Sequence, residues 1–276
     1  MSHPIVAALR SAAAEQRIAA CDAAPDDPSA VLLVEPLVAS LADRDTRVVR
    51  AATRALERIG RAHASVLVAL RPALRSDDPR HRLEAAWTWA RVEPPPIALL
   101  PAIVASLVHV EGDARWRAAR LLVELARMHG EAAPVVRSLA AADQPARVRG
   151  IALAALRELE PESDAMRGAH LAASRDPDPG LARLALLGLA GLRAPTREVW
   201  QRFAEVSASH ADPACRRIAE TALERRSQGG RRQSADAQRA ESFAQRAEGE
   251  RRPTGGPSEG SEPERERPAS AKARQD

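Results

Sequence analysis

The sequence predicts an all-α protein, an α-solenoid of about seven helix pairs followed by a disordered C-terminal tail. First, a pattern typified by residues 176–189 returns about every 33 residues, and periods of this size indicate stacked repeat arrays. Second, Ala, Leu and Val supply most of the apolar mass, only 2% of residues are aromatic and Tyr is absent, which favours helices over sheets. Third, the pattern stops at residue 226, where the composition changes.

The recurring pattern predicts the start of a helix in each repeat. The repeats are aligned on one position, the anchor, which is Leu181 in the pattern above. An Ala lies four residues after the anchor and a large apolar residue lies eight residues after it, so all three share one helical face. An Asp three residues before the anchor can cap the free N–H groups of that helix. The anchors are Gln16, Val48, His81, Trp116, Val148, Leu181 and Cys215. The Asp recurs as Asp45, Asp78, Asp113, Asp178 and Asp212.

The helix that contains the anchor is the second helix of its repeat, and a first helix is predicted before it. The tetrapeptide at residues 38–41 recurs at residues 104–107, two periods later, which supports the alignment independently. The first helices are predicted at residues 30–41, 64–74, 97–108, 132–141, 164–173 and 196–209.

This pattern of Asp, Arg, Ala and Leu resembles the HEAT repeat, especially the bacterial form related to phycobilisome-lyase repeats. The Asp-Pro-Asp-Pro stretch at residues 176–179 is the closest local match, and the resemblance covers about residues 10–226. It implies a curved, right-handed solenoid with the second helices on the concave side. The family includes scaffolds, chromophore-attachment proteins and DNA glycosylases, so the resemblance does not select one function.

The resemblance also implies a ladder of Asp and Arg side chains that joins adjacent repeats. It assigns a structural role to the Arg that follows the anchor, and the alternative is a row of anion-binding guanidinium groups. These arginines are Arg82, Arg117, Arg149 and Arg216.

Several repeats depart from the pattern. The Arg position holds Val49 and Ala182, the first repeat has Ala13 in place of the Asp, and the repeat at Trp116 has Arg120 where Ala is expected. The regular positions build the stack, so a functional site is expected where the copies differ. Besides the Arg-rich edges, these positions are Trp87, Trp116, Arg120 and Leu187.

The chain is predicted to divide into a HEAT-like repeat array at residues 1–226 and a low-complexity tail at residues 227–276. Phe243 is the one large apolar side chain of the tail, so the tail cannot bury enough surface to offset its ordering entropy. Residues 235–251 can form some helix. Cys21 and Cys215 lie in the first and last repeats and are predicted to be unpaired core residues.

A soluble, cytoplasmic protein is expected. The N-terminal residues lack the charged segment and long apolar core of a secretory signal. Residues 94–110 are mainly apolar, but they contain several prolines and fall short of the roughly 20 residues that span a membrane.

The side chains two and six residues after the anchor face away from the first helix, and they are expected to line the concave face. Across the repeats they are apolar in the middle and basic at the edges. We therefore predict a groove that receives an apolar helix or extended peptide whose acidic flanks meet the arginines. The alternative is that neighbouring second helices bury these side chains against each other. The candidate partner-binding residues are Arg50, Arg54, Trp87, Leu122, Ala154, Arg183, Leu187 and Arg217.

The expected function is non-enzymatic: a rigid scaffold that binds a protein or peptide, with no cofactor, no metal and no catalytic residue. The seven histidines show no metal-ligand spacing, and glycine-rich phosphate loops and a Gly-x-Ser-x-Gly elbow are absent. No residue set matches the pigment site of a chromophore lyase.

The alternative function is a nucleic-acid-binding or alkylated-base repair protein on the same HEAT-like scaffold. Residues 1–226 hold 31 basic and 28 acidic residues, a small excess for neutralising phosphates. The side chains available for such a role are Trp87, Trp89, Trp116 and Arg115.

Overall fold

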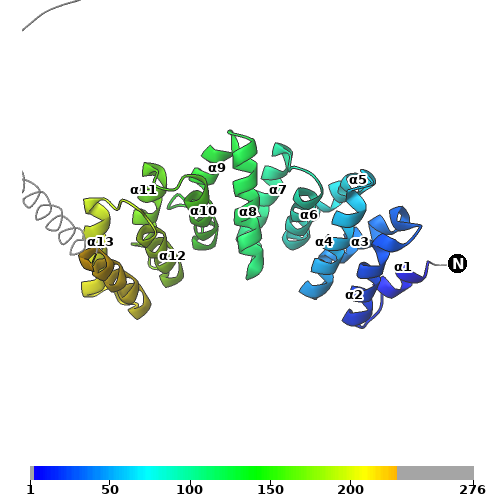
Figure 1. Cartoon of the computed structure of the whole chain (residues 1–276), viewed down its shortest axis with the longest axis horizontal. Helices are drawn as coiled ribbons and strands as arrows, with labels where there is room; N and C mark the ends of the chain where they lie inside the picture. The colour runs from blue at the N-terminus through cyan, green and yellow to red at the C-terminus, as the bar shows by residue number, and fades with distance from the viewer. Residues whose placement is uncertain (1–2, 229–276) are drawn as a thin grey trace, which may run out of the picture. The chain divides into compact units, whose positions relative to one another are not determined.

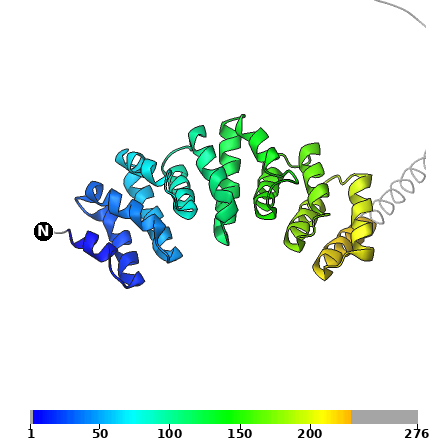
Figure 2. The ribbon, with the colours of Figure 1, turned by 180° about the vertical axis from the view of Figure 1, so that it is seen from behind.

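The computed structural model describes residues 3–228, and within this range the chain forms helices and loops without a strand. Residues up to Glu224 belong to one compact unit, which Figures 1 and 2 show as a curved row of stacked helices. The predicted α-solenoid of about seven helix pairs is therefore confirmed. The predicted tail at residues 227–276 lies outside the described residues, except for its first two residues, which continue the last helix.

Each repeat contains a first helix and a second helix, joined by short loops. The first helices are α1 (Pro4–Leu9), α3 (Val34–Ala39), α5 (Ser65–Ala73), α7 (Leu100–Ser106), α9 (Ala132–Ser138), α11 (Asp164–Ala173) and α13 (Arg197–Ser209). The second helices are α2 (Ala14–Ala23), α4 (Thr46–Gly60), α6 (Pro79–Val92), α8 (Asp113–Met128), α10 (Ala146–Leu159), α12 (Pro179–Ala190) and a helix at residues 213–228.

Two predicted first helices, at residues 30–41 and 97–108, are each divided into an α-helix between 3₁₀ turns. Pro36 and Pro101 lie in the first turns of α3 and α7, where a missing N–H is tolerated, so the residues before these turns are not part of the α-helix. The 3₁₀ turns are Ala30–Leu33, Ser40–Ala42, Ile97–Leu99 and Leu107–His109.

The helices form two layers, with the first helices on the convex side and the second helices on the concave side (Figure 1). Small residues at the predicted position allow neighbouring helices to approach closely, since Ala52, Ala85, Ala152 and Ala185 are all fully buried. The core therefore runs along the whole stack between the two layers.

Aspartate caps start several of the second helices, as the pattern predicted. The side chain of Asp45 accepts a hydrogen bond from the helix N–H of Arg47 at 2.8 Å, and that of Asp178 accepts one from Leu181 at 2.8 Å. Asp78 caps α6 in the same way. These caps satisfy N–H groups that have no partner inside the helix.

The ladder between repeats is present, which supports the structural interpretation of its arginines. Arg17 pairs with Asp43 of the next repeat at 2.7 Å, and Arg149 pairs with Asp176 in the same relative position. Arg82 donates to backbone carbonyl groups of the loop before its own helix. These contacts engage the guanidinium groups within the array, which favours a structural role over a row of anion-binding groups.

Candidate partner-binding groove

Helix α8 is out of register with the sequence alignment, and this shift creates one wall of a groove. Trp116, the predicted anchor, is 58% exposed, whereas the anchors Val48 and Val148 are buried. The pattern of buried residues in α8 instead places Ala118 at the anchor position. Ala118 lies 37 residues after His81 and 30 residues before Val148, so a regular period cannot locate it.

The register shift corrects one of the predicted groove residues. Leu122 is fully buried, because it lies four residues after the true anchor, at the position that packs into the core. The prediction that Leu122 lines the groove is therefore wrong. Arg120 takes the exposed position two residues after the anchor, which explains why it stands where the alignment expected a buried Ala.

The backbone before α8 explains the shift. Gly112 precedes α8 with φ of +53°, a conformation that favours glycine, and Asp113 is the first residue of the helix rather than its cap. The prediction that Asp113 caps this helix is thus wrong. Helix α8 starts five residues before its anchor, whereas α4 and α10 start two residues before theirs, so α8 gains nearly one extra turn.

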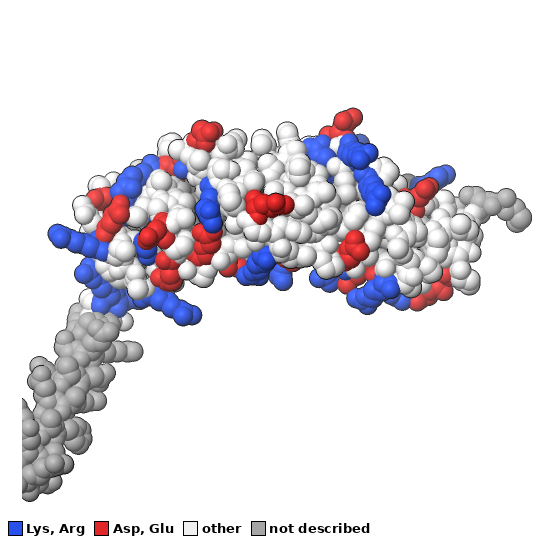
Figure 3. Space-filling view, turned by 90° about the horizontal axis from the view of Figure 1, so that it is seen from above, with Lys and Arg blue, Asp and Glu red and all other residues white. Residues whose placement is uncertain are grey.

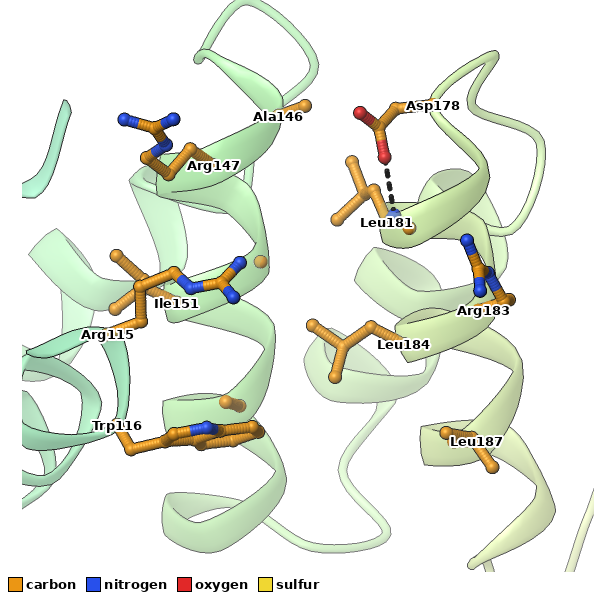
Figure 4. Close-up of a pocket in the computed structure, with 13 residues that line it drawn as sticks. Arg115, Trp116, Ala146, Arg147, Ile151, Asp178, Leu181, Arg183, Leu184 and Leu187 are labelled. Carbon is orange, nitrogen blue, oxygen red and sulfur yellow. Dashed lines mark hydrogen bonds between the residues drawn. The ribbon is translucent and has the colours of Figure 1, made fainter. Parts of the chain in front are cut away.

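Arg115, on the extra turn of α8, and Trp116, which follows it, lie beside α10, and α12 lies on the other side of α10 (Figure 4). Between them is a groove of about 640 Å³ on the second-helix layer. Its floor contains Gly150 and Ala154 of α10, whose small side chains leave the helix surface low. The groove thus exists because small residues on α10 lie between larger ones on α8 and α12.

The walls of the groove are apolar and partly exposed. Trp116 lies on the α8 side, and Leu184 and Leu187 lie on the α12 side, with Leu184 directed toward α10 (Figure 4). Leu187 is 50% exposed, in contrast to the fully buried Leu186 and Leu189 of the same helix. Large apolar side chains exposed next to one another typically mark an interaction site.

The charges around the groove are mainly basic. Arg147 pairs with Glu111 at 3.1 Å, and Arg183 pairs with Asp212 at 3.2 Å, while the side chain of Arg115 has no hydrogen-bond or ion-pair partner among residues 3–228. The one carboxylate in the lining belongs to Asp178, which is engaged as the cap of α12.

Figure 3 shows a different distribution on the face seen from above. Basic and acidic side chains are interspersed there among uncharged ones, so that face presents no continuous basic surface.

The structure brings together only some of the predicted partner-binding residues. Ala154, Arg183 and Leu187 line the groove. Trp87 is half-buried and packs against the core. Three predicted residues lie elsewhere on the array: Arg50, Arg54 and Arg217.

Two of these arginines are engaged by carboxylates. Arg50 pairs with Asp113 at 2.6 Å, and Arg54 pairs with Asp22 at 3.2 Å. The alignment did not place Arg115 or Leu184 in a groove. The signal for Arg115 was the irregular spacing around α8, which brings a wall from one repeat next to the floor of another; Leu184 had no such signal.

Buried polar groups outside the groove have structural roles. Glu84 of α6 is buried and pairs with Arg117 of α8; burial raises the pKa of its carboxyl group, although Arg117 opposes the shift. Cys21 and Cys215 are buried free thiols, as predicted, and burial is the main cause that raises their pKa values to about 12 and about 11.

Two other kinds of site are absent from residues 3–228. No three His, Cys, Asp or Glu side chains are placed to hold a metal ion together. None of the helices in this range combines the length and apolar character of a membrane span.

No protein-family profile matches the chain, and no curated protein sequence matches it. Solved structures with a similar fold include HEAT-like and armadillo repeat proteins. The archaeal HEAT-like repeats protein from Thermococcus onnurineus NA1 is 12% identical, with 80% of this chain and 94% of that chain covered and a TM-score of 0.47. The complex of CpcE and CpcF of phycocyanin lyase from Nostoc sp. PCC7120 is 17% identical, with 81% and 95% covered and a TM-score of 0.37.

A computationally designed armadillo repeat protein for modular peptide recognition is also similar. It is 16% identical, with 80% of this chain and 97% of that chain covered and a TM-score of 0.32. Because these sequence identities and TM-scores are low, the assignment of this chain as an α-solenoid rests on its own stacked helix pairs.

Proposed function

We propose that this protein is a non-enzymatic scaffold that binds a protein or peptide segment in the groove across α8, α10 and α12. The observation that carries the proposal is the arrangement of Trp116 and Leu187, which are both about half exposed on opposite sides of a floor made by Gly150 and Ala154. Side chains like these gain most when a partner removes them from water.

The size and composition of the groove support binding. Its volume of about 640 Å³ lies within the range of roughly 300–1,000 Å³ that is typical of ligand sites, enough for a few partner side chains. Its lining combines apolar side chains with a few arginines, the composition expected for a site that buries an apolar anchor and orients it with polar contacts.

The lining favours binding over catalysis. Among its residues there is no Ser, Thr, Cys, His or Lys side chain that could act as a nucleophile or general base. The carboxylate of Asp178 already accepts a hydrogen bond from the N–H of Leu181. The groove therefore offers surface and charge rather than a reactive group.

The proposal can be tested by selecting binders from a library of displayed random peptides with the full chain as bait. Gly150→Leu fills the floor of the groove, and a Cβ at this position makes only ordinary contacts, 3.5 Å to Leu184 and 3.9 Å to Leu181. Gly168→Leu is the matched control, because Gly168 also lies in a helix and a Cβ there has open space around it.

We expect peptides whose binding is lost in Gly150→Leu and retained in Gly168→Leu. If no selected peptide distinguishes the two variants, the groove is not the binding surface and the proposal fails. Helical circular dichroism of both variants checks that the repeat array stays folded.

A further inference from the structure

We infer that the occupant of the groove is an acidic peptide segment that carries one large apolar side chain close to its carboxylates. The inference rests on the proposed function and specifies the chemistry of the partner.

The shape requires a single bulky anchor. Gly150 and Ala154 leave a depression on α10 that no side chain among residues 3–228 fills, and Trp116, Leu184 and Leu187 surround it. A large aliphatic or aromatic side chain that enters this depression buries apolar surface on three helices at once. Several smaller side chains would leave gaps between these walls, which forfeits the contacts that close packing provides.

Arg115 provides a cation whose side chain has no hydrogen-bond or ion-pair partner among the residues that the structure describes. It precedes Trp116 on the extra turn of α8, and Figure 4 shows its guanidinium group extended toward α10. The planar guanidinium group of Arg matches a carboxylate with two parallel hydrogen bonds. A carboxylate of the partner near the apolar anchor is the group that completes this contact.

The other two arginines at the groove can also exchange partners. Arg147 and Glu111 form a solvent-exposed pair, in which the Glu111 side chain is 77% exposed. Exposed pairs of this kind contribute about 1 kcal/mol or less, so an incoming carboxylate can replace Glu111 at little cost. Arg183 is likewise about half exposed beside Asp212.

The same charges disfavour a basic partner. Asp178 is the one acidic residue of the lining, and its carboxylate caps α12. A Lys or Arg side chain in the groove would therefore face three guanidinium groups and one carboxylate. Like-charge contact of this kind is how binding surfaces exclude wrong partners.

The experiment sequences the peptides that the full chain selects and measures one of them, labelled with fluorescein, by anisotropy. The variant is Arg115→Glu, and the matched control is Arg71→Glu, since Arg71 is exposed on α5 of the first-helix layer and outside the groove. We expect Asp and Glu to be enriched around a single Leu, Ile, Phe or Trp. Arg115→Glu should weaken binding by about tenfold or more, and Arg71→Glu by less than about twofold.

The outcomes separate this inference from the proposed function. Peptides that need Gly150 but contain no acidic residues, or that bind Arg115→Glu as tightly as the original chain, would overturn the acidic partner and leave the groove as the binding surface. Self-association of the full chain that is lost in Gly150→Leu would identify a second copy as the occupant and would also overturn it. Selection of no peptide that depends on Gly150 would remove both proposals.

Discussion

Arg50 of α4 forms an ion pair with Asp113 at the start of α8, with 2.6 Å between Nη2 and Oδ2, although the whole repeat that contains α6 lies between them in the sequence. Helix pairs in solenoids ordinarily contact only their nearest neighbours. The contact exists because the extra turn of α8 brings Asp113 within reach of the second-next repeat. Arg50, which the sequence offered as a free cation for a partner, is thus engaged within the array.

The Arg50–Asp113 pair should contribute little to stability. Both side chains are more than half exposed, so a double-mutant cycle of Arg50→Gln and Asp113→Asn is expected to give a coupling free energy of about 1 kcal/mol or less. The coupling should fall further as salt is added, because screening acts on exposed charges. A coupling of several kcal/mol in urea unfolding would show that the contact locks the curvature instead.

The buried Arg149–Asp176 pair should matter far more. Both side chains are largely buried, and Arg149→Met leaves Asp176 as an uncompensated charge, so we expect a loss of about 3–5 kcal/mol in the free energy of unfolding. Arg54→Met is the matched control, since Arg54 and its partner Asp22 are both more than half exposed. Urea unfolding followed by circular dichroism measures both variants. Equal losses would contradict the assignment of Arg149 to a ladder inside the stack.

Gly188 should not tolerate a methyl group. A Cβ at Gly188 would overlap Cδ2 and Nε2 of His170, a buried ring held by a hydrogen bond that Nδ1 donates to the carbonyl of Met166. We expect Gly188→Ala to cost about 1–3 kcal/mol of unfolding free energy through overpacking. Gly168→Ala, at an open helical position, should instead stabilise by about 0.5–1 kcal/mol. Thermal unfolding of the two variants should therefore shift in opposite directions.

The buried imidazole of His170 should make stability fall in mild acid. Burial lowers the pKa of His170 in the folded protein and the nearby Arg157 adds to this, while the hydrogen bond to Met166 opposes it. The folded state therefore binds fewer protons than the unfolded state, in which the histidine has a pKa of about 6.5. Stability linked to His170 is complete above that pH and is lost as the pH falls through it.

The measurement compares urea unfolding of the original chain and of His170→Gln at pH values from about 8 to 5, the range in which an unfolded histidine gains its proton. Other titrating groups contribute equally to both proteins, so the difference between the two free energies isolates His170. That difference should be constant at the alkaline end and should change toward relative destabilisation of the original chain below about pH 6.5. A difference that stays constant down to pH 5 would show that the imidazole accepts a proton without cost.

The helix pairs and their caps were predictable from the sequence because they depend on interactions between residues close in the chain. The spacing of four and eight residues after Val48 and Leu181 places apolar side chains on one face of a helix. Asp45 and Asp178 cap these helices through N–H groups two or three residues away. Ala154, Arg183 and Leu187 could be placed on the exposed side for the same reason.

The tertiary structure alone decided the register of α8 and therefore the walls of the groove. A period counts residues, whereas packing depends on where a helix begins, and Gly112 lets α8 begin nearly one turn early. The register of α8 exposes Trp116 and buries Leu122, and the extra turn brings Arg115 to α10. The sequence by itself determined a curved stack of helix pairs, since each pair is specified by local spacing. The groove joins side chains from three different repeats, so only the packing of those repeats against one another could define it.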